Sequence, residues 1–195
     1  MTQTEAERNQ HEQHERGWIE KARAGESAAI SWLYERYSTR VYSYAYVKLG
    51  DPDEAADVTQ QVFLKVLEKL DGFQWHGAGF AAWLFRIAHN QIVDTQRRNA
   101  RRQHLPIDAA GSMLSGDSTD PAKYAEGRDF LDRVRHAMLQ LSELQVQVVT
   151  LRYAAELSNT EIAEVMSKTP NAVNSLHYEA LKKLGTVLTA EGYTP

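Results

Sequence analysis

Apolar residues recur at every third or fourth position through most of the 195 residues, which is the spacing of helices that bury one face. No stretch alternates between apolar and polar residues with the period of two that a strand requires. We therefore predict an all-α fold. The predicted helices cover about 27–49, 52–70, 79–102, 130–141, 143–153, 159–166 and 170–188.

Two segments lack this period and divide the chain. Residues 1–16 are polar and charged, and we predict that they form a disordered tail. Residues 103–125 combine Pro, Gly, Ser and Asp without periodicity, which is typical of a flexible linker. The chain then divides into two small helical domains, at 17–102 and 126–190.

Helix start signals support the predicted boundaries. Asp51 stands before Pro52 as an N-cap stands before a proline at the first helical position, and Glu54 completes the pattern of a capping box. Similar start signals recur later in the chain, at Ser142, Ser158 and Thr169.

Composition limits the possible functions. The chain has 22 Lys and Arg against 26 Asp and Glu, a net charge of -4, so any nucleic-acid contact depends on local basic patches. It has no Cys, which excludes disulfides, thiolate zinc sites and Cys nucleophiles and fits a reducing compartment. No signal core or apolar run of about 20 residues is present, so we expect a soluble cytoplasmic protein.

Enzyme motifs are missing from the sequence. It contains no glycine-rich phosphate loop, no HExxH motif and no Ser/His/Asp set in a recognisable context. We therefore predict that the protein is not an enzyme and requires no cofactor and no metal.

The predicted helix over 79–102 is apolar and aromatic in its first half and basic at its end. The preceding loop, 71–79, carries two aromatic residues, Phe73 and Trp75. Basic residues near aromatic rings suit unstacked bases, because every base has a face to stack. The simpler interpretation is an amphipathic helix with a solvated basic end, with Phe73 filling the bundle.

The second half contains a short helix, a tight turn and a longer helix, which is the pattern of a helix-turn-helix. The start of the second helix would enter the major groove, where Asn can pair bidentately with adenine, and Ser and Lys can contact bases or phosphates. A plain helical hairpin is the alternative. The candidate contact residues are Asn171, Asn174, Ser175, Tyr178 and Lys182.

One face of the predicted 52–70 helix looks suited to a protein partner. Beside its apolar line it carries two glutamines, a carboxylate and Leu64, where a solvated face is usually rich in Lys and Glu.

The sequence resembles bacterial RNA polymerase sigma factors of the extracytoplasmic-function group, in the sigma-70 family. The similarity covers about 18–188, and its motifs are specific only as an ordered set. They are ARAGESAAISWLYERYSTRVYSYA, GDPDEAADVTQQVFLKVLEKL, FAAWLFRIAHNQIVDTQRRN and LSNTEIAEVMSKTPNAVNSLHYEALKKL.

The resemblance implies two helical domains, regions two and four, joined by a flexible linker. It implies core RNA polymerase, promoter DNA and an anti-sigma factor as partners, with acidic linker residues acting as a nucleic-acid mimic. The residues that match the segment docking on the clamp helices of the largest polymerase subunit are Asp57, Gln60, Gln61, Phe63 and Leu64. Those that match the minus-ten pocket and its phosphate contacts are Phe73, Asn90, Asp94, Arg97, Arg98 and Arg101, with Trp75 beside them. The helix that reads the minus-thirty-five element contains the helix-turn-helix residues named above.

The chain departs from the family pattern in region four. Ser167 stands where the turn usually has Gly, and the last helix has two Lys against one Glu between 170 and 184. The 80–102 segment, by contrast, has five Arg against one Asp. Because phosphate contacts set much of the affinity, we expect region four to bind DNA weakly without help. We also expect Leu176 and Leu181 to face a protein such as an anti-sigma factor.

Two other functions fit parts of the sequence. An autonomous helix-turn-helix regulator would bind duplex DNA without polymerase, but it has no use for the glutamine face of the 52–70 helix. A degenerate interaction module would have lost DNA binding, which the Arg cluster at 97–102 disfavours.

Overall fold

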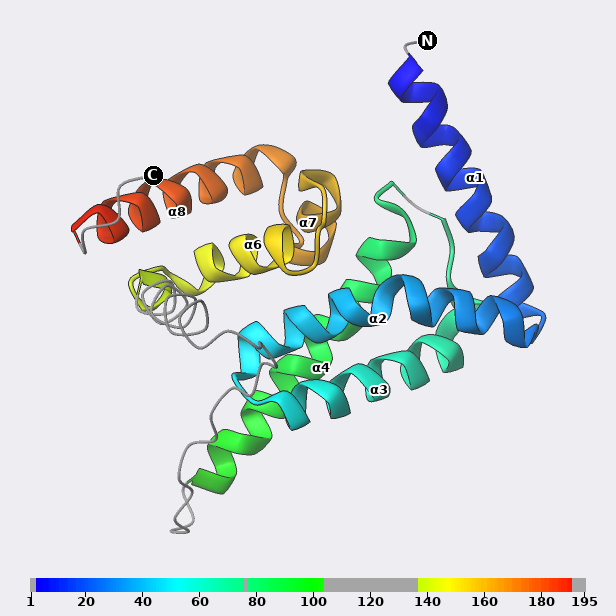
Figure 1. The fold of residues 1–195 in the computed structure, drawn as a ribbon, viewed down its shortest axis with the longest axis horizontal. Helices are drawn as coiled ribbons and strands as arrows, with labels where there is room; N and C mark the ends of the chain where they lie inside the picture. The colour runs from blue at the N-terminus through cyan, green and yellow to red at the C-terminus, as the bar shows by residue number, and fades with distance from the viewer. Residues whose placement is uncertain (1–2, 76, 104–136, 191–195) are drawn as a thin grey trace, which may run out of the picture.

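The computed structural model describes residues 3–75, 77–103 and 137–190. Every element within them is a helix, so the predicted all-α fold class is confirmed (Figure 1). The predicted linker beyond residue 103 and most of the predicted 130–141 helix lie outside the described residues. None of the described helices combines the length and apolar composition that a membrane crossing needs.

The first half is a helical bundle built around α2. Its helices pack through an aromatic core in which Tyr44, Phe80 and Phe85 have no exposed surface. The Asp51 carboxylate caps α3 by accepting the amide of Glu54 at 2.9 Å, as predicted. The elements are α1 (Gln3–Arg23), α2 (Ser27–Leu49), α3 (Pro52–Lys69), the 3-10 turn η1 (Leu70–Gly72) and α4 (Gly79–Gln103).

Residues 3–16 are helical, so the prediction of a disordered tail is wrong for this segment. They form the first turns of α1, whose start projects beyond the bundle in Figure 1. Where α1 reaches the bundle, Glu15 accepts a hydrogen bond from Tyr37, and Trp18 stacks on Trp32 with ring centroids 5.4 Å apart. These tertiary contacts stabilise a helix that its polar composition alone does not predict.

The second half consists of α6 (Glu143–Tyr153), α7 (Asn159–Met166) and α8 (Pro170–Ala190). Capping boxes at Ser142 and Ser158 begin α6 and α7. The Thr169 hydroxyl accepts the amide of Ala172 at 3.2 Å at the start of α8. All three predicted start signals are confirmed. Ser167 ends α7 in the left-handed conformation, with φ 53°, which explains why glycine suits this position.

The two halves pack against each other, which the sequence did not predict. In Figure 1, α7 lies beside α4, and α6 approaches α2. One hydrophobic cluster runs through both halves and includes Leu84 of α4 and Leu151 and Ile162 of the second half. A smaller cluster joins α6 to α8 through Val149 and Ala180.

Candidate nucleic-acid interface

One exposed stripe runs along the outer side of α4. Helical spacing places its members on one face, because they recur at intervals of three or four residues. All are exposed in the structure, and Arg98 also donates to the Thr95 hydroxyl at 3.0 Å. The stripe therefore offers an amide and a carboxylate followed by three guanidinium groups. Its members are Asn90, Asp94, Arg97, Arg98 and Arg101.

Phe73 does not belong to this stripe, because its ring is buried in the bundle. Its ring is 4% exposed and packs against Phe80 and Trp83, with centroids 5.4 and 5.0 Å away. Phe73 therefore fills the bundle, as the simpler interpretation of the sequence predicted.

Trp75 is the loop aromatic that remains partly accessible. It is half-buried, with one edge contact to Phe73 at 5.2 Å between centroids. The Arg16 guanidinium of α1 lies 4.7 Å from the centre of the Trp75 ring, a cation–π distance. Sequence reasoning missed Arg16 because it assigned residues 1–16 to a disordered tail.

The outer face of α3 holds the candidate polymerase-docking residues. Asp57, Gln60 and Leu64 are exposed, and Leu64 at 61% is a large apolar side chain in water. Two predicted members turn inward instead. Phe63 is 8% exposed against Tyr34, and Gln61 accepts a hydrogen bond from Gln91 of α4.

Exposed apolar residues extend this α3 face beyond the predicted set. Leu67 is 38% exposed and Tyr34, on α2, is 46% exposed. A groove of about 350 Å³ lies between α2 and α3 beside them. The sequence could not separate these two residues from the core, because both follow the apolar period. The groove is lined by Tyr34, Ser38, Thr39, Tyr42, Ala56, Thr59 and Gln60.

A polar cleft of about 200 Å³ connects the α3 face to the basic end of α4. On one wall, Glu54 accepts two hydrogen bonds from Asn99, at 2.8 and 2.9 Å, so its carboxylate does not close the predicted capping box. Asp57 and Arg98 also line the cleft. The candidate protein-binding and nucleic-acid-binding faces are therefore adjacent.

Helix α8 presents its polar residues to solvent. All five predicted contact residues, from Asn171 to Lys182, are exposed, and Tyr178 reaches 69%. The Ser175 hydroxyl donates to the carbonyl of Asn171 at 3.1 Å. Asn174 accepts a hydrogen bond from Asn159, the first residue of α7. The sequence offered no signal for Asn159, because the contact joins residues fifteen positions apart on two helices.

The prediction that Leu176 faces a partner protein is wrong. Leu176 is half-buried and packs against the main hydrophobic cluster. Leu181 is 41% exposed, in agreement with the prediction of an outward position, while Leu184 packs in the smaller cluster.

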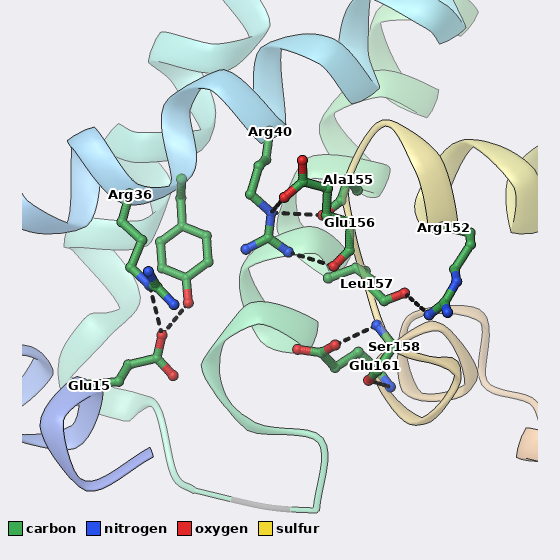
Figure 2. A network of polar contacts seen from close by, with 10 residues as sticks. Glu15, Arg36, Arg40, Arg152, Ala155, Glu156, Leu157, Ser158 and Glu161 are labelled. Carbon is green, nitrogen blue, oxygen red and sulfur yellow. Dashed lines mark hydrogen bonds and ion pairs between the residues drawn. The ribbon is translucent and has the colours of Figure 1, made fainter. Parts of the chain in front are cut away.

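Two arginines of the first half hold the second half through its backbone. Arg40 of α2 donates to the carbonyls of Ala155 and Glu156, at 2.8 and 3.2 Å, as Figure 2 shows. Arg86 of α4 donates to the carbonyl of Glu164 in α7 at 2.6 Å. Glu156 is in the left-handed region with φ 54°, so this loop has a defined and unusual shape.

His89 lies at the junction of three helices. Its Nδ1 is 3.0 Å from the hydroxyl of Tyr44 on α2, and Gln147 of α6 is 3.3 Å from the same atom. Burial and the nearby charge of Lys48 lower the pKa of His89, and Glu143 of α6 opposes that shift. A neutral imidazole therefore fits this junction better than a charged one.

The chain matches two protein-family models. Residues 33–102 match sigma-70 region 2, and residues 131–184 match sigma-70 region 4. The first contains α3 and α4, and the second contains the helix-turn-helix.

Curated relatives carry the same family name. The chain is 33% identical over 172 residues to the ECF RNA polymerase sigma factor BldN of Streptomyces coelicolor, which covers 87% of this chain and 64% of BldN. It is 27% identical over 175 residues to the ECF RNA polymerase sigma factor SigW of Bacillus subtilis, which covers 85% of this chain and 93% of SigW.

A solved structure shares the fold. The sigma factor RpoE of Bartonella quintana, in complex with the anti-sigma factor NepR, superposes with a TM-score of 0.61. Its identity is 20%, and the match covers 82% of this chain and 96% of that chain. The region 2 and region 4 matches and the curated relatives confirm the resemblance drawn from the sequence motifs. The chain belongs to the sigma-70 family, among its extracytoplasmic-function sigma factors.

Proposed function

We propose that this protein binds core RNA polymerase through the outer face of α3 and directs it to promoters through α4 and α8. The exposed α4 stripe is the observation that carries the proposal. It places an amide and a carboxylate, which can read a base edge, next to three arginines that can hold phosphates. The protein then contributes binding energy to promoter opening and performs no chemical step of its own.

The α3 face supplies the polymerase contact in this proposal. Leu64, Leu67 and Tyr34 form its apolar part, with Asp57 and Gln60 beside them. An exposed apolar patch with a polar rim is typical of a protein-binding surface. By analogy with the family, the partner is the pair of clamp helices of the largest polymerase subunit.

The two DNA contacts differ in kind. Trp75 and the α4 stripe would hold single-stranded minus-ten DNA, because Trp75 offers a ring and the arginines follow the strand. The exposed start of α8 would read the minus-thirty-five duplex in the major groove. Flipping a base out of the minus-ten duplex costs a few kcal/mol, which base contacts made by region two would offset.

An anti-sigma factor is the proposed regulator. RpoE of Bartonella quintana is seen with the anti-sigma factor NepR, and this chain shares its fold. Leu181 and Tyr178 give α8 an exposed apolar surface that a protein could cover. Since polymerase and promoters meet in the cytoplasm, we place the protein there.

Binding to core polymerase can be tested by comparing the same substitution at two exposed leucines. We expect Leu64→Asp to weaken binding of the full chain to core polymerase about tenfold or more, since it puts a charge at the centre of the docking face. Leu139→Asp is the matched control, because Leu139 is 79% exposed and lies outside that face. Equal affinities of both variants, measured by fluorescence anisotropy, would contradict the proposed docking face.

A further inference from the structure

A second residue determines which end of the Asn174 side-chain amide faces outward. It is the fifth residue of α8, on the face that the proposed function directs into the major groove. Its Oδ1 accepts a hydrogen bond from Nδ2 of Asn159 in α7. The Asn174 amide is therefore oriented with its oxygen toward α7, and its Nδ2 is left to meet the base.

The orientation is held by rigid surroundings. Asn159 follows Ser158, whose capping box begins α7, and Thr169 caps the start of α8. Ile162 and Val173, both fully buried, fix the packing between the two helices. No described residue accepts a hydrogen bond from Nδ2 of Asn174. The backbone on both sides of the pair is thus fixed by capped helix starts, which keeps the two amide groups within reach of each other.

An asparagine that offers only its Nδ2 donor recognises other bases than an asparagine whose amide is free to rotate. An asparagine that pairs with adenine uses both of its groups, since it donates to N7 and accepts from N6. Because Oδ1 accepts from Asn159 and is held toward α7, the group that Asn174 turns to the groove is its Nδ2 donor. Guanine presents two adjacent acceptors in the major groove, N7 and O6. Adenine presents the N7 acceptor beside its N6 donor, which a donor group on the protein would face unfavourably, and cytosine presents only a donor.

We propose that Asn159 is a specificity-determining residue of this sigma factor, which makes Asn174 a reader of acceptor edges and so of guanine rather than adenine. The inference rests on the proposed function, because it assumes that α8 reads a duplex. It replaces, for this position, the general expectation that asparagine selects adenine.

Reversing the polarity of the pair is the sharpest test. In Asn159→Asp the new carboxylate can only accept, so Nδ2 of Asn174 turns toward α7 and Oδ1 faces the groove. The position should then select a base that donates, adenine or cytosine. Asn159→Ala should release the amide and admit adenine beside guanine. We expect a shift of about fivefold or more in relative base preference, the lower end of what a good bidentate contact provides.

The experiment is a selection from duplexes randomised across the upstream contact region, with the full chain bound to core polymerase. Asn174→Ala identifies the base pair that Asn174 reads, and Thr160→Asp is the charge control, because Thr160 is an exposed neighbour on α7. We expect Asn159→Asp to change preference at that base pair alone, and Thr160→Asp to weaken binding evenly.

Two results would overturn the inference while leaving the proposed function in place. One is a wild-type preference for adenine at the Asn174 base pair, and the other is an unchanged preference there in Asn159→Asp. A wild-type chain that enriches no upstream sequence would overturn duplex reading by α8, and the inference with it.

Discussion

Phe73 and Trp75 lie two residues apart in one loop and have different surroundings. Phe73 is enclosed by Phe80 and Trp83, whereas Trp75 is half-buried and carries Arg16 over its ring. The Arg16 guanidinium gives that ring a cationic neighbour and also pairs with Glu12 at 2.7 Å. Phe73 therefore packs in the bundle, and the DNA contact of Trp75 stays a prediction.

Phe73→Ala is expected to act on stability. A buried Phe truncated to Ala typically costs about 3–5 kcal/mol, from lost transfer free energy and the cavity left behind. Chemical denaturation of the full chain would measure the loss. Trp75→Ala is the comparison, and we expect it to cost less in stability while weakening promoter opening. A Phe73→Ala protein with wild-type stability and defective promoter opening would restore the stacking role.

The lowered pKa of His89 leads to a prediction of how folding stability depends on pH. Its folded-state pKa is lowered from the ordinary value of 6.5, mainly by burial, so the unfolded chain binds more protons in the window below that value. Stability is then complete above pH 6.5 and falls as the pH decreases through that window. We expect His89→Gln to flatten this dependence in denaturation midpoints taken at successive pH values. His177, whose pKa burial also lowers, should leave a residual slope. An unchanged slope in the variant would contradict the assignment.

At the scale of elements, the loop between α6 and α7 joins the second half to the bundle. Its carbonyls at Ala155 and Glu156 accept hydrogen bonds from Arg40, whose side chain is 19% exposed. Arg152 braces the same loop from α6 by donating to the carbonyl of Leu157 at 2.9 Å (Figure 2). The contact is therefore made to backbone atoms whose positions the loop conformation determines.

Arg40→Ala should loosen the contact between the halves. It removes two charge-assisted hydrogen bonds, each worth about 1.5–3 kcal/mol in favourable cases. We expect a larger radius of gyration by small-angle scattering, with unchanged helix content by circular dichroism. Arg101→Ala, an exposed arginine of the α4 stripe, serves as the control. A radius equal to the wild-type value would mean that the apolar cluster alone holds the halves together.

Local sequence signals predicted most of the helices. The tertiary contacts were not predicted, for a physical reason. Caps and apolar periods located α2, α3 and the helix-turn-helix within a few residues, since both signals are local. Arg40 and Arg86 donate to backbone carbonyls. Because every residue has a backbone carbonyl, no pattern of side chains in the sequence indicates which carbonyls these arginines contact. The contacts of Glu15 and Trp18 of α1 with α2 join distant parts of the chain, so they lie outside any local pattern.

The sequence predicted the positions of the candidate site residues better than the orientation of their side chains. Exposed residues such as Asn90 and Arg97 lie where the resemblance placed them on α4, and their DNA contacts stay a prediction. Phe63 and Phe73 match family positions but point into the core, because a motif match gives a position and leaves orientation undetermined. The sequence did not indicate the contact of Asn159, because that contact is made with a residue of another helix.

At the scale of the whole molecule, charge is distributed unequally between the two proposed DNA-binding faces. The α4 segment from 80 to 102 has five Arg against one Asp, and the α8 segment from 170 to 184 has two Lys against one Glu. Phosphate neutralisation supplies much of the affinity for DNA, so α4 should provide the main electrostatic contact. The minus-thirty-five contact would then contribute selection of sequence more than strength.

Run-off transcription is the most direct test of this account. The full chain is combined with core polymerase on promoter fragments from its source genome, beside Leu64→Asp and the Leu139→Asp control. We predict transcripts from discrete start sites with the wild-type chain and the control, and their loss with Leu64→Asp. A wild-type chain that binds promoter duplex yet neither associates with core polymerase nor yields transcripts would contradict the central claim that it initiates transcription.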